Sequence, residues 1–181
     1  MTNLVEYYPK VLDKPLRLVM KIMNFVIISS GLILALTFFF VVILRYGFGA
    51  DLFAYEEWLM CIAFWMFFLG SAVATHDRQH VNADIVGFMI EHPTLLYIRA
   101  LIVESLELII LLVIVYWGYL MIKECILAYP SWQQTVALKI PFLVPRLGIF
   151  VGFLMMAIYN ILHLYVLIRG HAECYNAPDL E

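Results

Sequence analysis

The sequence predicts an all-α integral membrane protein with four transmembrane helices and short interfacial amphipathic helices. Hydrophobic residues make up 65% of the 181 residues and charged residues only 14%, whereas soluble domains are close to half apolar and a quarter charged. With 11 Lys and Arg, 14 Asp and Glu and 5 His, the chain could not cover a globule of this size with polar surface. Much of the surface must therefore face lipid. The net charge of -3 and the pI near 5.9 also argue against a nucleic-acid partner.

A helix needs about 20 apolar residues to cross a hydrocarbon core that is about 30 Å thick. Four stretches approach this length, at residues 22–44, 58–75, 100–122 and 141–168. The first two contain no charged side chain, whereas the third contains Glu104 and Glu107. In the fourth, Pro141 suits the first turn of a helix, and Pro145 indicates a bent or irregular start. The whole chain, residues 1–181, is expected to form one membrane domain.

The basic residues near the span ends predict the orientation, because cytoplasmic segments carry the excess of Lys and Arg. With the N-terminus inside, the inner segments hold seven basic residues: Lys10, Lys14, Arg17, Lys21, Arg78, Arg99 and Arg169. The outer segments hold four: Arg45, Lys123, Lys139 and Arg146. Both termini are therefore expected in the cytoplasm, and residues 169–181 form a cytoplasmic tail.

Two polar segments have the pattern of helices that lie in the membrane interface. Residues 10–21 place basic side chains on one helical face and apolar ones on another, which suits contact with anionic headgroups. Because of Pro15, a positively charged flank without a defined helix is an equally good interpretation. Residues 81–92 carry an apolar stripe but are too short to cross, so they predict an interfacial helix between the second and third spans. Trp58 lies where membrane proteins have their aromatic belts.

Glu104 and Glu107 stand three residues apart and therefore project from one face of the third span. A carboxylate within the bilayer needs a partner or water. One hypothesis is a cation or proton relay. The alternative is a polar seam that packs against another subunit or pairs with Arg78 or Arg99. Since the outer half of this span, residues 108–115, has no polar group, an ion pathway within this chain alone is not expected.

At the outer ends of the first two spans, Arg45 lies close in sequence to Glu56 and Glu57. The loop between them is short, so Arg45 is expected to meet one of these carboxylates and clamp the helix ends together. The alternative function is a docking surface for an external partner. Both can hold, because one carboxylate could pair internally while the other faces outward.

Histidines near the other ends of the spans raise a different class of function. His76, His80 and Asp84 cluster beside Arg78, and His163 lies toward the same side of the membrane. Two histidines that meet across a four-helix bundle could hold a haem, as in a membrane-anchor subunit of cytochrome b type. The sequence has no Ser/His/Asp set, Gly-rich phosphate loop or metal-ligand spacing, so we expect no enzyme, metal or cofactor site.

Several short motifs occur in an order that resembles the small (Q) membrane subunit of tripartite ATP-independent periplasmic (TRAP) transporters. They are Arg45-Tyr46, Glu56-Glu57-Trp58, Phe68-Leu69-Gly70, Arg78-x-His80-Val81-x-x-Asp84, Ala137-Leu138-Lys139-Ile140-Pro141 and Pro145-x-x-Gly148. The resemblance covers about residues 20–168. Arg146, Glu104 and Glu107 are not motif positions, so their roles rest on physical arguments alone.

The resemblance implies a multi-pass subunit of the bacterial inner membrane that binds a large M-type permease subunit and a periplasmic substrate-binding protein of P type. In such transporters the large subunit holds the substrate and sodium sites, and an organic acid is carried. This chain would then be a non-catalytic scaffold, and its outer loops, residues 47–55 and 129–139, would help receive the binding protein. Candidate contact residues for partners are Arg45, Glu56, Glu57, Trp58, Arg78, His80, Asp84, Glu104, Glu107 and Arg146. A tetraspan protein that assembles only with itself is the remaining alternative.

Overall fold

The structure, a computed structural model, describes residues 10–78 and 93–168, which form helices and loops. The helices are α1 (Lys10–Gly47), α2 (Tyr55–His76), α4 (Pro93–Leu127) and α5 (Leu143–Ile168). Within these ranges there is no β-strand beyond a single bridge between Gln134 and Pro141. His80, Asp84, the helix predicted at 81–92 and the tail at 169–181 lie outside the described residues.

Three of these helices contain segments long and apolar enough to cross a membrane, namely Lys14–Gly47, Tyr55–His76 and Leu143–Ile168. They correspond to the first, second and fourth predicted spans. The helix that contains the third, α4, has 35 residues but is not among them. The structure therefore confirms an all-helical chain with three candidate spans, and the span at 100–122 stays a prediction.

The helix ends differ from the predicted boundaries in two places. Residues 10–21 are not a separate element, because α1 runs without a break from Lys10 through Pro15 to Gly47. Its 38 residues would measure about 57 Å, so part of α1 must extend beyond the hydrocarbon. At the other end of the chain Pro141 was wrongly placed in the helix. It lies in the preceding loop, and Pro145 instead occupies the first turn of α5.

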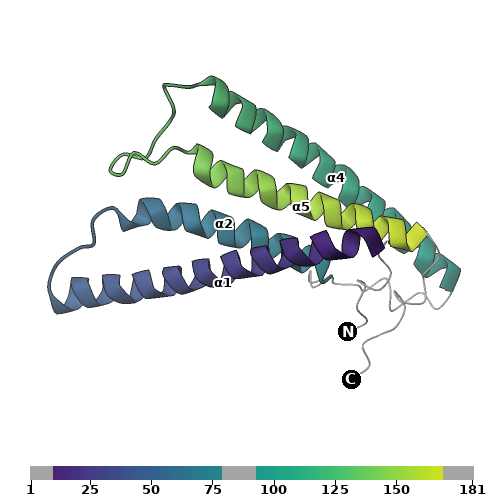
Figure 1. The fold of residues 1–181 in the computed structure, drawn as a ribbon, viewed down its shortest axis with the longest axis horizontal. Coiled ribbons are helices and arrows are strands. Elements are labelled where there is room, and N and C mark those ends of the chain that lie inside the picture. Colours follow the sequence, from purple (N-terminus) through teal and green to yellow (C-terminus); the bar gives the residue numbers. More distant parts are fainter. Residues whose placement is uncertain (1–9, 79–92, 169–181) are drawn as a thin grey trace.

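The helices lie in a row rather than in a closed bundle. The pairs that pack are α1 with α2, α2 with α5, and α5 with α4, so α1 and α4 form the two edges (Figure 1). The row fans out toward the end that carries the loops 48–54 and 128–142, which we call the loop end. At the opposite end, the base, α1 and α4 begin and α2 and α5 end.

The central seam of the row is a close approach of α5 to α2 at two glycines. A Cβ atom at Gly152 would stand 2.6 Å from Phe68 Cβ and 2.8 Å from the Phe68 carbonyl oxygen. A Cβ at Gly148, one turn earlier, would stand 3.1 Å from the Trp65 ring. Trp65 Nε1 also donates to the Val144 carbonyl at 3.0 Å. This Gly-xxx-Gly spacing is the small-residue pattern that lets membrane helices pack closely.

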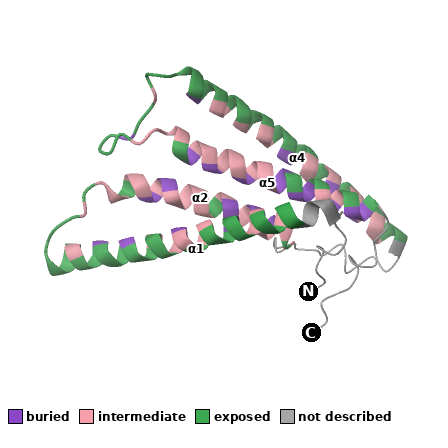
Figure 2. Ribbon diagram, in the orientation of Figure 1, coloured by how far each residue is buried: buried purple, intermediate pink, exposed green. Residues whose placement is uncertain are grey.

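The edge helices join this seam near the base. Tyr97 of α4 donates through its hydroxyl to the Leu167 carbonyl of α5 at 3.3 Å. On the other side, the Tyr159 hydroxyl of α5 reaches Met23 Sδ of α1 at 3.8 Å. The residues of the main core come from all four helices: Met23, Leu69, Ala72, Leu111, Met156, Ala157 and Tyr159. Buried residues accordingly concentrate along α2 and α5 and toward the base (Figure 2).

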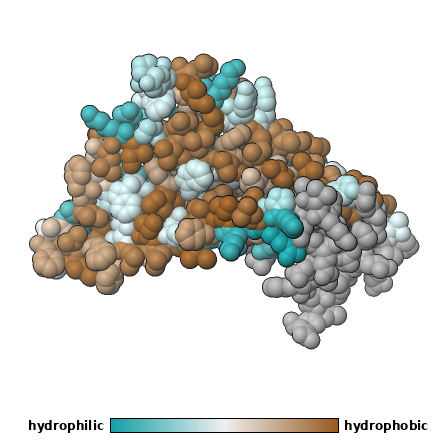
Figure 3. Space-filling view, in the orientation of Figure 1, coloured by the Kyte–Doolittle hydropathy of each residue, from teal (hydrophilic) through white to brown (hydrophobic). Residues whose placement is uncertain are grey.

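The edge helices leave long apolar faces uncovered. On α1, large side chains more than a third exposed follow one another at helical spacing: Leu18, Ile22, Phe25, Ile28, Leu32, Leu36 and Phe39. On α4, the same is true of Ile98, Ile102, Leu106, Ile109 and Val113. Apolar side chains dominate the face in Figure 3. Because water cannot solvate so much apolar surface, lipid or another membrane protein must cover it.

We predict that Gly152→Ala weakens the seam, because its Cβ would meet backbone atoms of Phe68 that cannot move independently. The expected loss is about 1–3 kcal/mol of unfolding free energy, measured by thermal or denaturant unfolding in detergent. Gly70→Ala is the matched control, since a Cβ at Gly70 meets nothing within 4 Å. Equal stability of the two variants would contradict the account of the seam.

Candidate functional site

At the loop end, Arg45 does not pair with Glu56 or Glu57 as the sequence suggested. Its Nε donates instead to Asp51 Oδ1 at 3.1 Å, within the loop that follows α1. Both side chains are more than half exposed, at 58% and 69%, so this ion pair contributes little stability. The pair shapes the α1–α2 loop rather than clamping the two helices.

Glu57 connects two loops that are far apart in sequence. Its Oε1 accepts the Ala137 amide N–H at 2.8 Å, and its Oε2 accepts the Leu138 amide N–H at 2.7 Å. Hydrogen bonds from amides to a carboxylate are stronger than those between neutral groups. The predicted clamp between the first two helices is therefore wrong, and Glu57 instead joins α2 to the α4–α5 loop. Glu56 is exposed, and Trp58 is half-buried in the same first turn of α2.

The α4–α5 loop also has internal order. Thr135 donates its amide to the Ile140 carbonyl at 3.0 Å, while its hydroxyl accepts the Ile140 amide at 2.9 Å. These two hydrogen bonds join Thr135 to Ile140, and Val136, which lies between them in sequence, is 95% exposed at the tip of the loop. Phe48 and Phe53 of the α1–α2 loop are likewise 76% and 75% exposed. The loop end thus presents apolar side chains on two braced loops beside the exposed Glu56.

At the base, ionisable side chains from α4, α5 and the residues just after α2 meet around Glu104. Glu104 Oε1 of α4 lies 3.6 Å from Arg78 Nη2, just beyond α2, and 3.6 Å from His163 Nδ1 of α5. Glu104 and His163 are buried, with residue exposures of 8% and 2%. Of the two interpretations of Glu104, the structure supports the polar seam, since the predicted pairing with Arg78 is present. Glu107, one turn further on, is half-buried.

Arg78 occupies a backbone position that normally favours glycine. The residue has φ 52°, in the left-handed region, and follows Asp77 at the C-terminal cap of α2. Its amide donates back to the Thr75 carbonyl at 3.3 Å, as expected for a helix end that closes in this way. A non-glycine residue in this conformation costs of order 1 kcal/mol or more. The ion pair between Arg78 and Glu104 supplies a reason for arginine at this position.

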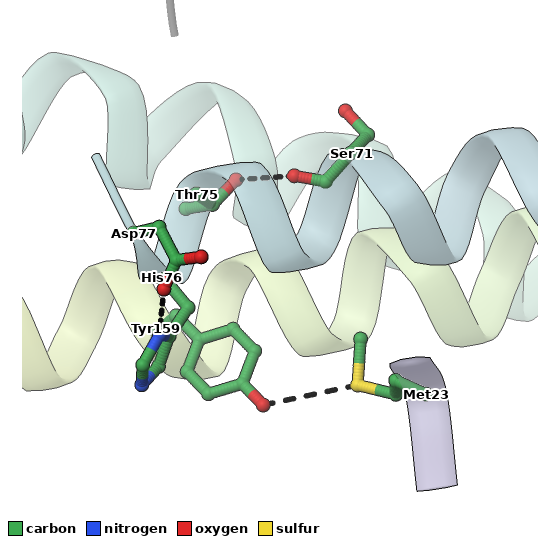
Figure 4. Close-up of polar contacts among 6 residues, drawn as sticks. All are labelled: Met23, Ser71, Thr75, His76, Asp77 and Tyr159. Atoms are coloured by element: carbon green, nitrogen blue, oxygen red, sulfur yellow. Dashed lines mark hydrogen bonds and ion pairs between the residues drawn. The ribbon is translucent and has the colours of Figure 1, made fainter. Parts of the chain in front are cut away.

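His76 and His163 belong to this polar region but not to a common ligand pair. His76 Nδ1 contacts Asp77 Oδ1 at 2.7 Å, and its ring lies edge-on against Tyr159 with centroids 5.0 Å apart (Figure 4). Tyr159 thus stands between α1 and the end of α2. His163 contacts Glu104. Each histidine is therefore engaged by its own acid, so the geometry supports a structural network rather than a haem site.

Arg146, a candidate partner contact that is not a motif position, lies at the loop end of α5. Its Nη1 donates to Cys125 Sγ of α4, and its Nη2 donates to Gln133 Oε1 at 3.3 Å. Arg146 lines a cavity of about 290 Å³ between α4, the α4–α5 loop and α5. Sequence reasoning missed this cavity because its walls come from residues that are up to 22 positions apart. The only available signal was a charge within an otherwise apolar span.

The comparison with known protein families identifies one family model that matches. Its description is "Tripartite ATP-independent periplasmic transporters, DctQ component", and the match covers residues 34–170. The matched region runs from the middle of α1 to the end of α5 and includes both ends of the row. No curated protein sequence gives a significant match.

We predict that Glu57→Gln releases the α4–α5 loop. The backbone N–H groups of Ala137 and Leu138 each bind a different oxygen of Glu57. A glutamine side chain has only one oxygen to accept these hydrogen bonds. Amide hydrogen exchange at Ala137 or Leu138 should accelerate about tenfold, the equivalent of one charge-assisted hydrogen bond. Glu56→Gln, at the neighbouring exposed position, should leave the same amides unchanged. Unaltered exchange in Glu57→Gln would show that other contacts hold the loop.

A second prediction concerns the buried acid at the base. Glu104→Gln leaves Arg78 and His163 without their anion and should lower the unfolding free energy by about 1–3 kcal/mol. Combining it with Arg78→Gln should cost less than the sum of the single losses, because the pair is then removed together. Glu56→Gln, at an exposed position of α2, is the control. Strict additivity in denaturant unfolding would contradict a direct interaction.

Proposed function

Because this chain belongs to the DctQ component family of tripartite ATP-independent periplasmic transporters, we propose that it is the non-catalytic scaffold of such a transporter. In this role it braces the large M-type permease subunit in the bilayer and forms part of the surface that receives the P-type periplasmic binding protein. The observation that carries the proposal is the family match itself, which spans residues 34–170. The family match establishes that this chain is a membrane component of a transporter. Its role within the complex is what we propose.

The open row of helices supports a scaffold role. Only one side of α1 and one side of α4 find partners within the described chain, and their remaining apolar faces are long and continuous. A transporter subunit that encloses a substrate needs convergent polar groups around a cavity. In the described part of the spans, the charged groups around Glu104 contact one another instead. This arrangement favours a rigid support over a transport path.

The proposed topology has four spans, with α4 crossing the bilayer through residues 100–122. Its apolar run from Leu108 to Ile122 and its packing along α5 support this assignment. Both termini would lie in the cytoplasm of a bacterium, and the loop end would face the periplasm across the inner membrane. The concentration of basic residues near the N-terminus supports this orientation.

The loop end is the proposed docking surface for the binding protein. Glu57 ties the α4–α5 loop to α2, so Val136 and the exposed Glu56 are held on one braced platform. Such a platform needs little ordering when a partner binds, which reduces the entropic cost of association. We further propose sodium coupling and an organic-acid substrate, with ions and substrate bound on the large subunit.

Uptake by proteoliposomes tests this function. Vesicles that contain the large subunit and this chain, supplied with the loaded binding protein and a sodium gradient, should accumulate substrate. Vesicles with the large subunit alone should not. Undiminished uptake without this chain would refute the obligate scaffold.

The same vesicles test the docking surface. Glu56→Lys should reduce uptake at low concentrations of binding protein, because it reverses a charge on the exposed platform. Glu181→Lys, the same change in the tail that we propose to be cytoplasmic, is the control. Identical uptake by both variants would remove Glu56 from the docking surface.

A further inference from the structure

The cavity beside Arg146 lies between the last turns of α4, the α4–α5 loop and the first turns of α5. Its walls include Glu124, Cys125, Trp132, Gln133, Leu143 and Arg146. The volume of about 290 Å³ is many times the roughly 30 Å³ that one water molecule occupies in the liquid. The cavity is therefore large enough for a charged group of several heavy atoms.

Arg146 gives this cavity a positive charge, and within residues 10–78 and 93–168 it forms no ion pair with an acid. Both of its hydrogen bonds within the described residues go to neutral acceptors, Cys125 Sγ and Gln133 Oε1. A guanidinium has five N–H donors arranged as a fork that matches phosphate and carboxylate oxygens. Donors of Arg146 remain for a ligand. A charge held at the edge of an apolar span is costly unless an anion or water meets it.

A second donor lies in the same wall. Trp132 Nε1 is shielded from solvent and has no hydrogen-bond partner in the described part of the chain. Buried indole N–H groups normally find an acceptor. The Trp132 ring is fixed by Tyr129, whose ring meets it edge to face with centroids 5.3 Å apart. The indole N–H is thus a buried donor behind the cavity wall, and the guanidinium of Arg146 is the donor that a ligand can reach.

The third feature is an acid. Glu124 also lines the cavity, yet it forms no ion pair with Arg146 or any other base among residues 10–78 and 93–168. A ligand that carried only a negative charge would be repelled by this carboxylate. A ligand with both an anion and an ammonium group could satisfy Arg146 and Glu124 together.

The depth of the cavity indicates which molecule carries these charges. On α4 the uncharged run from Leu108 ends at Ile122, and Lys123 and Glu124 are the first charged residues after it. Tyr129 and Trp132 follow at the position where aromatic side chains mark the headgroup level of a bilayer. The cavity thus lies where the apolar helices give way to polar chain, beside the headgroups of one leaflet.

We propose that this cavity binds the headgroup of a phospholipid with a primary amine, such as phosphatidylethanolamine. The phosphate accepts hydrogen bonds from Arg146, and the ammonium group donates to Glu124. The acyl chains extend from the cavity toward the middle of α4, along exposed side chains such as Tyr119 and Leu112. This site is independent of the transport role and would remain if that role were wrong.

Native mass spectrometry of the full-length chain, purified with any subunit that accompanies it and then stripped of lipid, tests the site. The probes are phosphatidylethanolamine, phosphatidylglycerol and inorganic phosphate. Wild-type protein should retain one phosphatidylethanolamine in preference to phosphatidylglycerol. Arg146→Gln should weaken this retention about tenfold, the loss of one charge-assisted hydrogen bond. Lys123→Gln, which removes a neighbouring charge outside the cavity wall, should bind as the wild type does.

Two further variants guard against misfolding and identify the ammonium contact. Arg146→Lys keeps the charge and should retain the lipid better than Arg146→Gln, with both variants checked for the same melting temperature as wild type. Glu124→Gln should abolish the preference for phosphatidylethanolamine while phosphatidylglycerol still binds. Retention by Arg146→Gln at the wild-type level, no preference between the two lipids in wild type, or competition by millimolar inorganic phosphate would overturn the proposal.

Discussion

The approach of α5 to α2 at Gly148 and Gly152 is the contact on which the rest of the structure depends. In a bilayer, apolar side chains gain little by leaving lipid for one another, so helices associate through close packing and polar contacts. The two helices can approach this closely only because α5 has no Cβ atom at Gly148 or at Gly152. It places the two most buried helices back to back and leaves α1 and α4 to add at the edges.

The row of helices has different consequences at its two ends. At the base, where the helices converge, Glu104 draws Arg78 and His163 together and so links α4, α2 and α5. At the loop end, where they diverge, Glu57 spans the gap by binding backbone amides of the α4–α5 loop. At the base, Glu104 adds polar contacts beside the apolar core that all four helices share, and at the loop end Glu57 joins α2 to the α4–α5 loop. Such a frame is rigid at both ends and apolar along its edges, which suits a transporter component that supports a larger partner.

The sequence predicts the part of this structure that depends on hydropathy and local spacing. Three of the expected spans reappear as long apolar helices, and Glu104 could be paired with Arg78 because both lie near the same ends of their spans. The order of helices in the row could not be predicted, although the spacing of Gly148 and Gly152 was a usable signal. Arg45 was assigned to the wrong acid. Asp51 and Glu57 are both close to Arg45 in sequence, but Glu57 binds backbone amides of the distant α4–α5 loop, and sequence proximity does not reveal this contact. The Arg146 cavity was missed for the same reason, since its walls meet only in the folded chain.

The central claim is that this chain is a supporting partner whose uncovered faces belong against a second, larger membrane subunit. Its most direct test is purification of the tagged full-length chain from its native membrane in mild detergent, with mass spectrometry of whatever remains bound at constant stoichiometry. The account predicts one larger polytopic membrane protein, bound in equal amount and lost when the apolar face of α1 is changed to polar residues. A stable homo-oligomer of this chain, with no second membrane protein, would contradict it.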